Sequence, residues 1–266
     1  MSGTIGLPVL VLDVAGVTGA GIVAALVEAG HAVLAASPDQ SPLHALRRRH
    51  AYAAGLRCLK GGTSSEASAR RLAAQVRRHA PAGVRAIVSG WSPSAATARL
   101  TERPVTALMD ALQSGLASPL HQARHLWPLL HEHSGQHLLV GGLAADCTWC
   151  GYGHLAIASA ARRMLVRMLH EEAGPRGIRV RMLAFARPPA GSAAPRPDAL
   201  GRDVAAMLAD AAALPGAVAI HRAAGTVCAN SAVATAVAAW LAGLAVPPPS
   251  SDSRSSLSSR TRTFPR

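Results

Sequence analysis

Short apolar segments alternate with segments of helical periodicity along most of the chain, and this alternation limits the fold more than any other feature. A short apolar run bounded by turn residues is typical of a buried strand, and apolar residues spaced three and four apart are typical of a covering helix. Strands and helices in alternation form a parallel sheet with helices on both faces, joined by right-handed crossovers. The sequence therefore predicts an α/β fold, a doubly wound parallel sheet in a single domain.

The expected elements follow from this pattern. Strands are predicted at residues 8–14, 31–36, 55–59, 84–89, 136–142 and 178–184. Helices are predicted at residues 19–29, 41–54, 65–79, 102–131, 152–173, 203–213 and 231–244. A break is expected in the fourth helix near Ser118 and Pro119, because proline lacks the N–H that a helix needs. Ligands of such sheets bind beyond the carboxyl ends of the strands, so the loops after the first, fourth and fifth strands are of most interest.

Residues 1–246 are predicted to form the domain and residues 247–266 a disordered tail, because the tail is rich in Pro, Ser and Arg and poor in apolar residues. Four cysteines are too few for a disulfide scaffold in 266 residues. Residues 1–8 lack the basic residues of a signal peptide, and no apolar run reaches the length of a membrane helix. We therefore expect a cytoplasmic protein without membrane association.

The net charge of +13 would normally favour a nucleic-acid partner. The basic residues are dispersed, however, and Lys60 is the only lysine, which is typical of proteins encoded by GC-rich genomes. Pairs such as Arg162 and Arg163 are expected on solvated helix faces. Aromatic residues make up only 3% of the chain, too few for the stacking surfaces that bind single strands. No nucleic-acid partner is expected.

Several segments are similar to those of a known family. The segment "VLVLDVAGVTGAGIVAALVEAGHAVLAAS" resembles the first βαβ unit of the short-chain dehydrogenase/reductase family, and "HEEAGPRGIRVRMLA" resembles its passage from a long helix into the sixth strand. The segments "EASARRL" and "SGLASPLHQARHLWPLL" fall at the family's spacing. The resemblance covers about residues 8–187 and implies a Rossmann-like fold. It also implies an NAD or NADP cofactor and carbonyl reduction, if the family's functional residues are present.

The resemblance places the family's three cofactor-loop glycines at Asp13, Gly16 and Gly19. Gly16 and Gly19 are the candidate cofactor-binding residues, although a tight turn with close helix–strand packing would equally explain them. Asp13 would repel the cofactor's phosphates. Gly62 stands where the family usually has an aspartate for the adenine, and Trp91 replaces a small residue beside the nicotinamide ribose. Weak or absent NAD(P) binding is therefore expected, with no cofactor.

The family's catalytic group is also missing. The family reduces its substrates with a tyrosine, a lysine four residues later, a serine and an asparagine. The resemblance places these four at Leu155, Ser159, Gly142 and Gly115. Because the only lysine lies far upstream of that helix, no tyrosine–lysine pair of this spacing exists in any alignment. The standard redox activity is therefore expected to be absent.

The loop after the fifth strand is the candidate catalytic site. It carries Asp146, Tyr152 and His154, which together could move protons. His154 would carry the proton, because its pKa lies near neutrality, Asp146 would orient it, and Tyr152 would be a donor. Such a set suits isomerisation, dehydration or cyclisation without a cofactor. The alternative is a polar, aromatic surface loop that closes the cleft.

The histidines of the fourth helix offer a second candidate. His121 and His125 are spaced four apart on one helix face, as two zinc ligands would be. His131, His133 and His137 follow, but Glu132 is the only nearby carboxylate. No metal site is expected.

The leading hypothesis is a diverged family member that binds a small organic substrate, in specialised metabolism, without standard redox activity. It would catalyse a non-redox step or act as a non-catalytic partner. One alternative is an NAD(P)-dependent oxidoreductase with unorthodox residues. Another is a regulatory or scaffolding subunit that pairs with an active homologue. A homodimer or heteromer is expected, formed through helices at about 103–131 and 152–173, with Arg162 and Arg163 as a polar edge.

Overall fold

The computed structural model describes residues 6–91, 98–131, 135–142, 153–185, 197–209, 218–221 and 227–229. The chain divides into two compact units, residues 1–231 and 232–266, and every described residue lies in the first. The predicted helix at 231–244 and the predicted tail at 247–266 lie outside the described residues.

The described strands form one sheet of eight, in the order β3-β2-β1-β4-β5-β6-β7-β8. They are β1 (Val9–Leu12), β2 (Val33–Ser37), β3 (Leu56–Lys60), β4 (Ala86–Ser89), β5 (Gln136–Gly142), β6 (Arg179–Phe185), β7 (Val218–His221) and β8 (Val227–Ala229). All neighbouring pairs are parallel except β7 and β8. The predicted α/β fold and its six strands are confirmed. The last two strands were not predicted, because three or four residues are too few to show a period of two.

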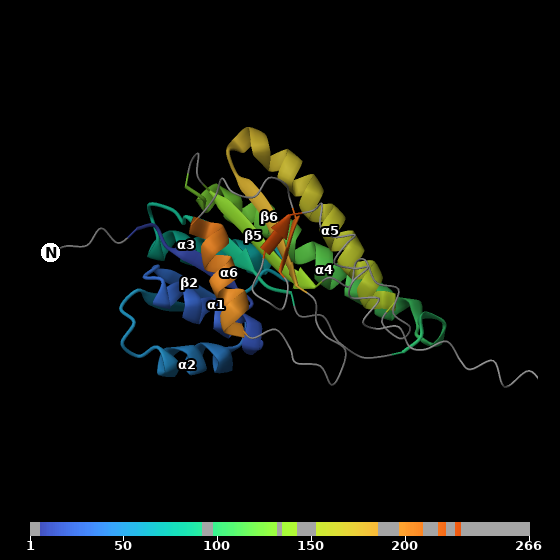
Figure 1. The fold of residues 1–266 in the computed structure, drawn as a ribbon, viewed down its shortest axis with the longest axis horizontal. Coiled ribbons are helices and arrows are strands. Elements are labelled where there is room, and N and C mark those ends of the chain that lie inside the picture. Colours follow the sequence, from blue (N-terminus) through green and yellow to red (C-terminus); the bar gives the residue numbers. More distant parts are fainter. Residues whose placement is uncertain are drawn as a thin grey trace, which may run out of the picture. The chain divides into compact units, whose positions relative to one another are not determined.

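Helices connect the strands and cover the sheet (Figure 1). They are α1 (Gly16–Glu28), α2 (Gln40–Arg49), α3 (Glu66–His79), α4 (Val105–Leu126), α5 (Gly153–Ala173) and α6 (Pro197–Ala209). α1 packs against α6, and α4 packs along α5. None of the described helices has an apolar stretch of the length that crossing a membrane requires.

The core has two sides because side chains alternate along each strand. Val9 and Val11 of β1 belong to a buried cluster with residues of α1, α2 and α6, whereas Leu10 and Leu12 point away from it and are equally buried. The helices of the first side approach closely. A Cβ atom at Gly201 of α6 would lie 2.5 Å from the carbonyl oxygen of Gly21 in α1. Glycine is therefore required at this helix–helix contact.

The end of α6 is held by side chains from three neighbouring strands or their flanks. Arg85, just before β4, donates to the carbonyl oxygen of Leu208 over 2.6 Å, and Gln136 of β5 donates to the same oxygen over 3.1 Å. Arg181 of β6 donates to the carbonyl oxygen of Met207 over 2.6 Å. These donors satisfy carbonyls that a helix C-terminus leaves without partners, and the two arginines also place positive charge at the negative end of the helix dipole.

Several helix predictions differ from the structure. α2 ends at Arg49 instead of residue 54, and α4 spans Val105–Leu126 instead of residues 102–131. The expected break near Ser118 and Pro119 does not occur. α4 runs unbroken through Pro119. Proline removes the helical hydrogen bond to the carbonyl of Gly115, and that carbonyl instead accepts from Nη1 of Arg162 over 2.8 Å. The helix expected at 203–213 instead begins at Pro197, where proline's fixed φ suits a first turn, and ends at Ala209.

Candidate functional site

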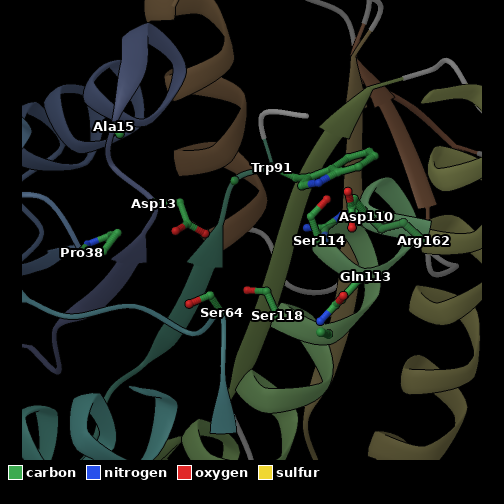
Figure 2. A pocket seen from close by; sticks show the side chains of 12 residues that line it. Asp13, Ala15, Pro38, Ser64, Trp91, Asp110, Gln113, Ser114, Ser118 and Arg162 are labelled. Atoms are coloured by element: carbon green, nitrogen blue, oxygen red, sulfur yellow. The ribbon is translucent and has the colours of Figure 1, made fainter. Parts of the chain in front are cut away.

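A cavity of about 460 Å³ lies beyond the carboxyl ends of the strands. It opens where β1 and β4 are neighbours, which is the point at which the strand order reverses. This is the position that doubly wound sheets use for ligands, as predicted. Figure 2 shows the residues that line it: Asp13, Ala15, Pro38, Ser64, Gly90, Trp91, Asp110, Gln113, Ser114, Ala117, Ser118 and Arg162.

Asp13 follows β1 directly and forms one side of the cavity (Figure 2). Its φ of 55° lies in the left-handed region that glycine favours and that aspartate tolerates better than most residues. The backbone therefore keeps a glycine-like conformation while the side chain adds a carboxyl group. Burial raises the pKa of this carboxyl group, and the charge of Arg162 acts in the opposite direction.

Gly19 has a packing role in the structure. A Cβ atom there would lie 2.7 Å from Cα of Val14 and 2.8 Å from the carbonyl oxygen of Asp13. Only glycine allows the start of α1 to approach the end of β1 this closely, so the packing explanation left open by the sequence is supported at Gly19. Gly16 is the first residue of α1.

Three residues from separate elements form one packed cluster on the other side of the cavity, the Trp91–Gly115–Arg162 cluster. The guanidinium of Arg162 lies over the indole of Trp91, 5.4 Å from the ring centroid. A Cβ atom at Gly115 would lie 3.2 Å from Cζ2 of Trp91, so the glycine makes room for the indole. The hydrogen bond from Arg162 to Gly115 closes the cluster. Trp91, which the resemblance places beside the nicotinamide ribose, lines the cavity.

Arg162 was missed as a site residue. It was expected on a solvated helix face, but only 1% of it is exposed. Burial lowers the pKa of its guanidinium to about 10 and the charge of Asp13 opposes this, so the group is still a cation near neutral pH. The sequence signal that could have revealed it is its position three residues after Ser159, because this spacing puts it on the same helix face as the position at which the resemblance places the catalytic lysine.

A chain of buried hydrogen bonds extends from the cavity wall into the core. The hydroxyl oxygens of Ser118 and Thr63 are 2.6 Å apart, and Nε2 of Gln122 donates to Ser118 over 2.9 Å and to Thr63 over 3.0 Å. Nδ1 of His137 accepts from Nε1 of Trp127, and Nε2 of His137 donates to Oε1 of Gln122, each over 3.0 Å. These partners require a neutral imidazole.

Burial lowers the pKa of His137 to about 3, and the charge of Arg162 acts in the same direction. His137 therefore stays neutral at physiological pH and joins α4 to β5. Two other histidines of the predicted group also have structural contacts, and His133 lies outside the described residues. Nδ1 of His121 is 2.9 Å from the carbonyl oxygen of Thr63, and Nε2 of His125 is 3.4 Å from the carboxylate of Glu66. In the described ranges, no three His, Cys, Asp or Glu side chains form a metal-binding group.

The predicted catalytic loop is only partly described. Asp146 and Tyr152 lie outside the described residues. His154 lies in the first turn of α5, is 4% exposed, and has its Nε2 3.2 Å from Nη1 of Arg103. Because a guanidinium only donates, this Nε2 is the acceptor. His154 is not among the residues that line the cavity.

The positions at which the resemblance places the family's catalytic group carry no acid or base. Leu155 and Ser159 lie on α5, Gly142 ends β5, and Gly115 lies in α4 against Trp91. Lys60 ends β3 and is exposed.

Comparisons with known proteins agree with this fold. Residues 15–232 match the family model described as enoyl-(acyl carrier protein) reductase. The RhlG/NADP active-site complex from Pseudomonas aeruginosa is 21% identical to this chain with a TM-score of 0.70, over 82% of this chain and 94% of that chain. A short-chain dehydrogenase from Streptomyces avermitilis is 17% identical with a TM-score of 0.68, over 90% of this chain and 94% of that one.

A third solved structure is of special interest. It is the apo structure of a short-chain oxidoreductase from Pseudomonas aeruginosa PAO1 that contains an atypical catalytic centre. It is 23% identical with a TM-score of 0.59, over 67% of this chain and 68% of that one. At these identities, the likeness to solved structures establishes the fold alone. A search of curated proteins gave no significant match.

Proposed function

The chain belongs to the short-chain dehydrogenase/reductase family, and from that premise we propose that its cleft binds a small organic molecule without nicotinamide-dependent redox chemistry. The observation that carries this proposal is the Trp91–Gly115–Arg162 cluster. By the resemblance, Trp91 stands beside the place of the nicotinamide ribose and Gly115 at the place of the catalytic asparagine. Here an indole and a guanidinium pack over these positions.

The other side of the cavity supports the same proposal. Asp13 brings a carboxyl group to the position where the family's first glycine lets the cofactor's phosphates approach. A carboxylate and a phosphate at a poorly solvated site repel each other by about a few kcal/mol. Hydride transfer would also lack its proton donor, because no tyrosine–lysine pair of the family's spacing is present.

The remaining chemistry is a non-redox step or binding alone. Proton transfer by Asp146, Tyr152 and His154 would suit isomerisation, dehydration or cyclisation of a bound molecule. Replacing these residues singly by Asn, Phe and Gln tests this, with product formation in the native pathway as the readout. A rate loss of roughly 100-fold at His154 is expected for acid–base work. Full activity in all three folded variants would leave binding alone as the function of the cleft.

A second candidate function is NAD(P)-dependent oxidoreduction with unorthodox residues. The solved relatives favour it, because RhlG forms a complex with NADP and another relative contains an atypical catalytic centre. The two functions differ in one measurable property, which is the affinity for the nucleotide.

A third candidate is a regulatory or scaffolding subunit that pairs with an active homologue. Large apolar side chains are exposed on the two helices expected to meet a partner, including Val105 and Met109 of α4 and Met164 and Met168 of α5. Co-purification with an intact homologous reductase would support this candidate.

Calorimetric titration with NAD⁺, NADH, NADP⁺ and NADPH tests the proposal. P. aeruginosa RhlG is the positive control, and the Asp13→Gly/Trp91→Ala double variant is the matched test of the cavity. No wild-type affinity in the micromolar range is expected, and the double variant is expected to bind the nucleotide more tightly. Micromolar wild-type affinity, or NAD(P)H turnover that persists through purification, would contradict the proposal.

A further inference from the structure

We propose that the cavity binds a small organic acid whose carboxylate pairs with the guanidinium of Arg162. This inference rests on the proposed function, because it assigns a ligand class to the same cavity. It depends on one electrostatic observation. Arg162 is a buried cation at the wall of the cavity, and its guanidinium has fewer partners than a buried charge needs.

The hydrogen bonding of Arg162 is incomplete. Its Nη1 donates to Gly115, and its Nε is buried without a hydrogen-bond partner. Nη2 is the remaining guanidinium nitrogen, and because Arg162 lines the cavity, we assign Nη2 as the donor available to a ligand. Only 1% of the residue is exposed, so water can compensate little of its charge. A buried ion of this kind is normally paired, and a carboxylate is the group that suits a guanidinium best.

Trp91 does not replace that partner. The indole face stabilises a cation over it, but it accepts no conventional hydrogen bond from the guanidinium. The indole instead adds an apolar wall beside the cation, which suits a carboxylate attached to a flat or apolar body. The volume of about 460 Å³ lies within the range that small-molecule sites occupy.

Asp13 is the acid whose charge acts on the pKa of Arg162, but no ion pair joins the two among the described residues. Figure 2 places them on opposite sides of the cavity. A ligand carboxylate at Arg162 would add a second negative charge to the space that Asp13 faces. Asp13 would then favour its protonated form, which can donate a hydrogen bond to the ligand.

Other charges near Asp13 are few. Within the described residues, Arg162 of α5 and Asp110 of α4 line the cavity with it, and the first turn of α1 carries no acidic residue. Asp110 is exposed at the cavity mouth, where solvent screens its charge. The affinity for a carboxylate should therefore fall as rising pH ionises Asp13.

Benzoate and benzamide are suitable probes, because they have the same shape and differ in charge. Calorimetric titration of the full chain is expected to show that benzoate binds at least about tenfold more tightly than benzamide. Arg162→Met is expected to weaken benzoate binding by about 30-fold or more. Arg167→Met is the matched control, because Arg167 lies on the exposed face of the same helix, and it should bind like the wild type.

Asp13→Asn is the second variant, since asparagine also tolerates the left-handed backbone of this position. It should bind benzoate more tightly than the wild type at high pH and lose the decline in affinity with rising pH. Titrations above about pH 5 are suitable, because benzoate stays ionised there. Circular dichroism of each variant shows whether it is folded, and the neutral variant Arg162→Gln replaces Arg162→Met if the latter is not.

The outcomes separate this inference from the proposed function. Equal binding of benzoate and benzamide, or no loss in a folded Arg162 variant, overturns the carboxylate site and leaves the cavity free to bind a neutral molecule. Absence of benzoate binding at millimolar concentration also overturns it. Micromolar binding of NADPH would instead overturn the proposed function, whatever the benzoate titration gives.

Discussion

Arg162 supplies the hydrogen bond that Pro119 cannot make. In a regular α-helix the N–H of residue 119 would bond to the carbonyl of Gly115, and here Nη1 of Arg162 donates to that oxygen from α5 over 2.8 Å. The two long helices are thus joined at the one turn where α4 lacks its own bond. The same contact fixes the guanidinium beside Trp91 at the cavity wall.

This relationship predicts an energetic coupling between the two residues. Arg162→Met alone should destabilise the fold by about 1–2 kcal/mol, because it leaves the buried Gly115 carbonyl without a donor. In a Pro119→Ala background the new N–H fills that role, so the loss should shrink by about 0.5 kcal/mol or more. Urea unfolding of the two single variants and the double variant measures the coupling. Strictly additive losses would show that the two residues act independently.

The pKa of His137 predicts how stability depends on pH. The folded pKa is about 3, whereas an unfolded histidine titrates near pH 6.5, so the unfolded state binds the extra proton between these values. Stability is therefore fully present above about pH 6.5 and is lost as the pH falls toward 3. Between pH 7 and pH 5 the wild type should lose about 2 kcal/mol more than a His137→Gln variant. Parallel losses in the two proteins would mean that His137 does not titrate in this way.

The contact between α1 and α6 predicts the effect of one added methyl group. Gly201→Ala should destabilise the fold by about 1–3 kcal/mol, because the new Cβ would overlap Gly21 and Ala25 of α1. Gly174→Ala is the control, since a Cβ there meets nothing within 4 Å. Thermal unfolding should place the control near the wild type and Gly201→Ala clearly below it, and similar melting temperatures for both would contradict the packing argument.

The exposed side chains of α4 and α5 predict self-association. Met109, Met164 and Met168 are 57%, 54% and 52% exposed, which leaves apolar surface that a second copy could cover. Light scattering at micromolar concentration should give the mass of a dimer for the wild type and of a monomer for Met109→Glu/Met168→Glu. Arg48→Glu on α2 serves as the control for added negative charge. A monomeric wild type would count against this interface.

The sequence predicted the sheet because its signal is local. Strands such as β4 and β5 are short apolar runs, and their neighbours in the sheet follow from the handedness of the crossovers. The positions of Asp13 and Trp91 were predicted from the family resemblance, which is anchored to the ends of β1 and β4 that these residues follow. Arg162 could not be recognised in this way, because its burial depends on an indole and a carbonyl from distant parts of the chain. Its neighbour Arg163 is only partly buried, so an arginine pair does not show which member turns inward.

The order in which the protein folds is constrained by the hydrogen bonds that hold the end of α6. These bonds are donated by Arg85, Gln136 and Arg181. The donors lie on or beside β4, β5 and β6. The surface that binds the end of α6 therefore forms only after these three strands have paired. During synthesis the chain up to β6 therefore emerges before the two α6 carbonyls that Arg85 and Arg181 bind. Docking of α6 is then a late step, because its contacts join residues far apart in the sequence, and such contacts form slowly. In a nascent chain that stalls before residue 197, water would hydrate the surface that binds α6. The adjoining apolar face of the sheet would stay accessible to chaperones.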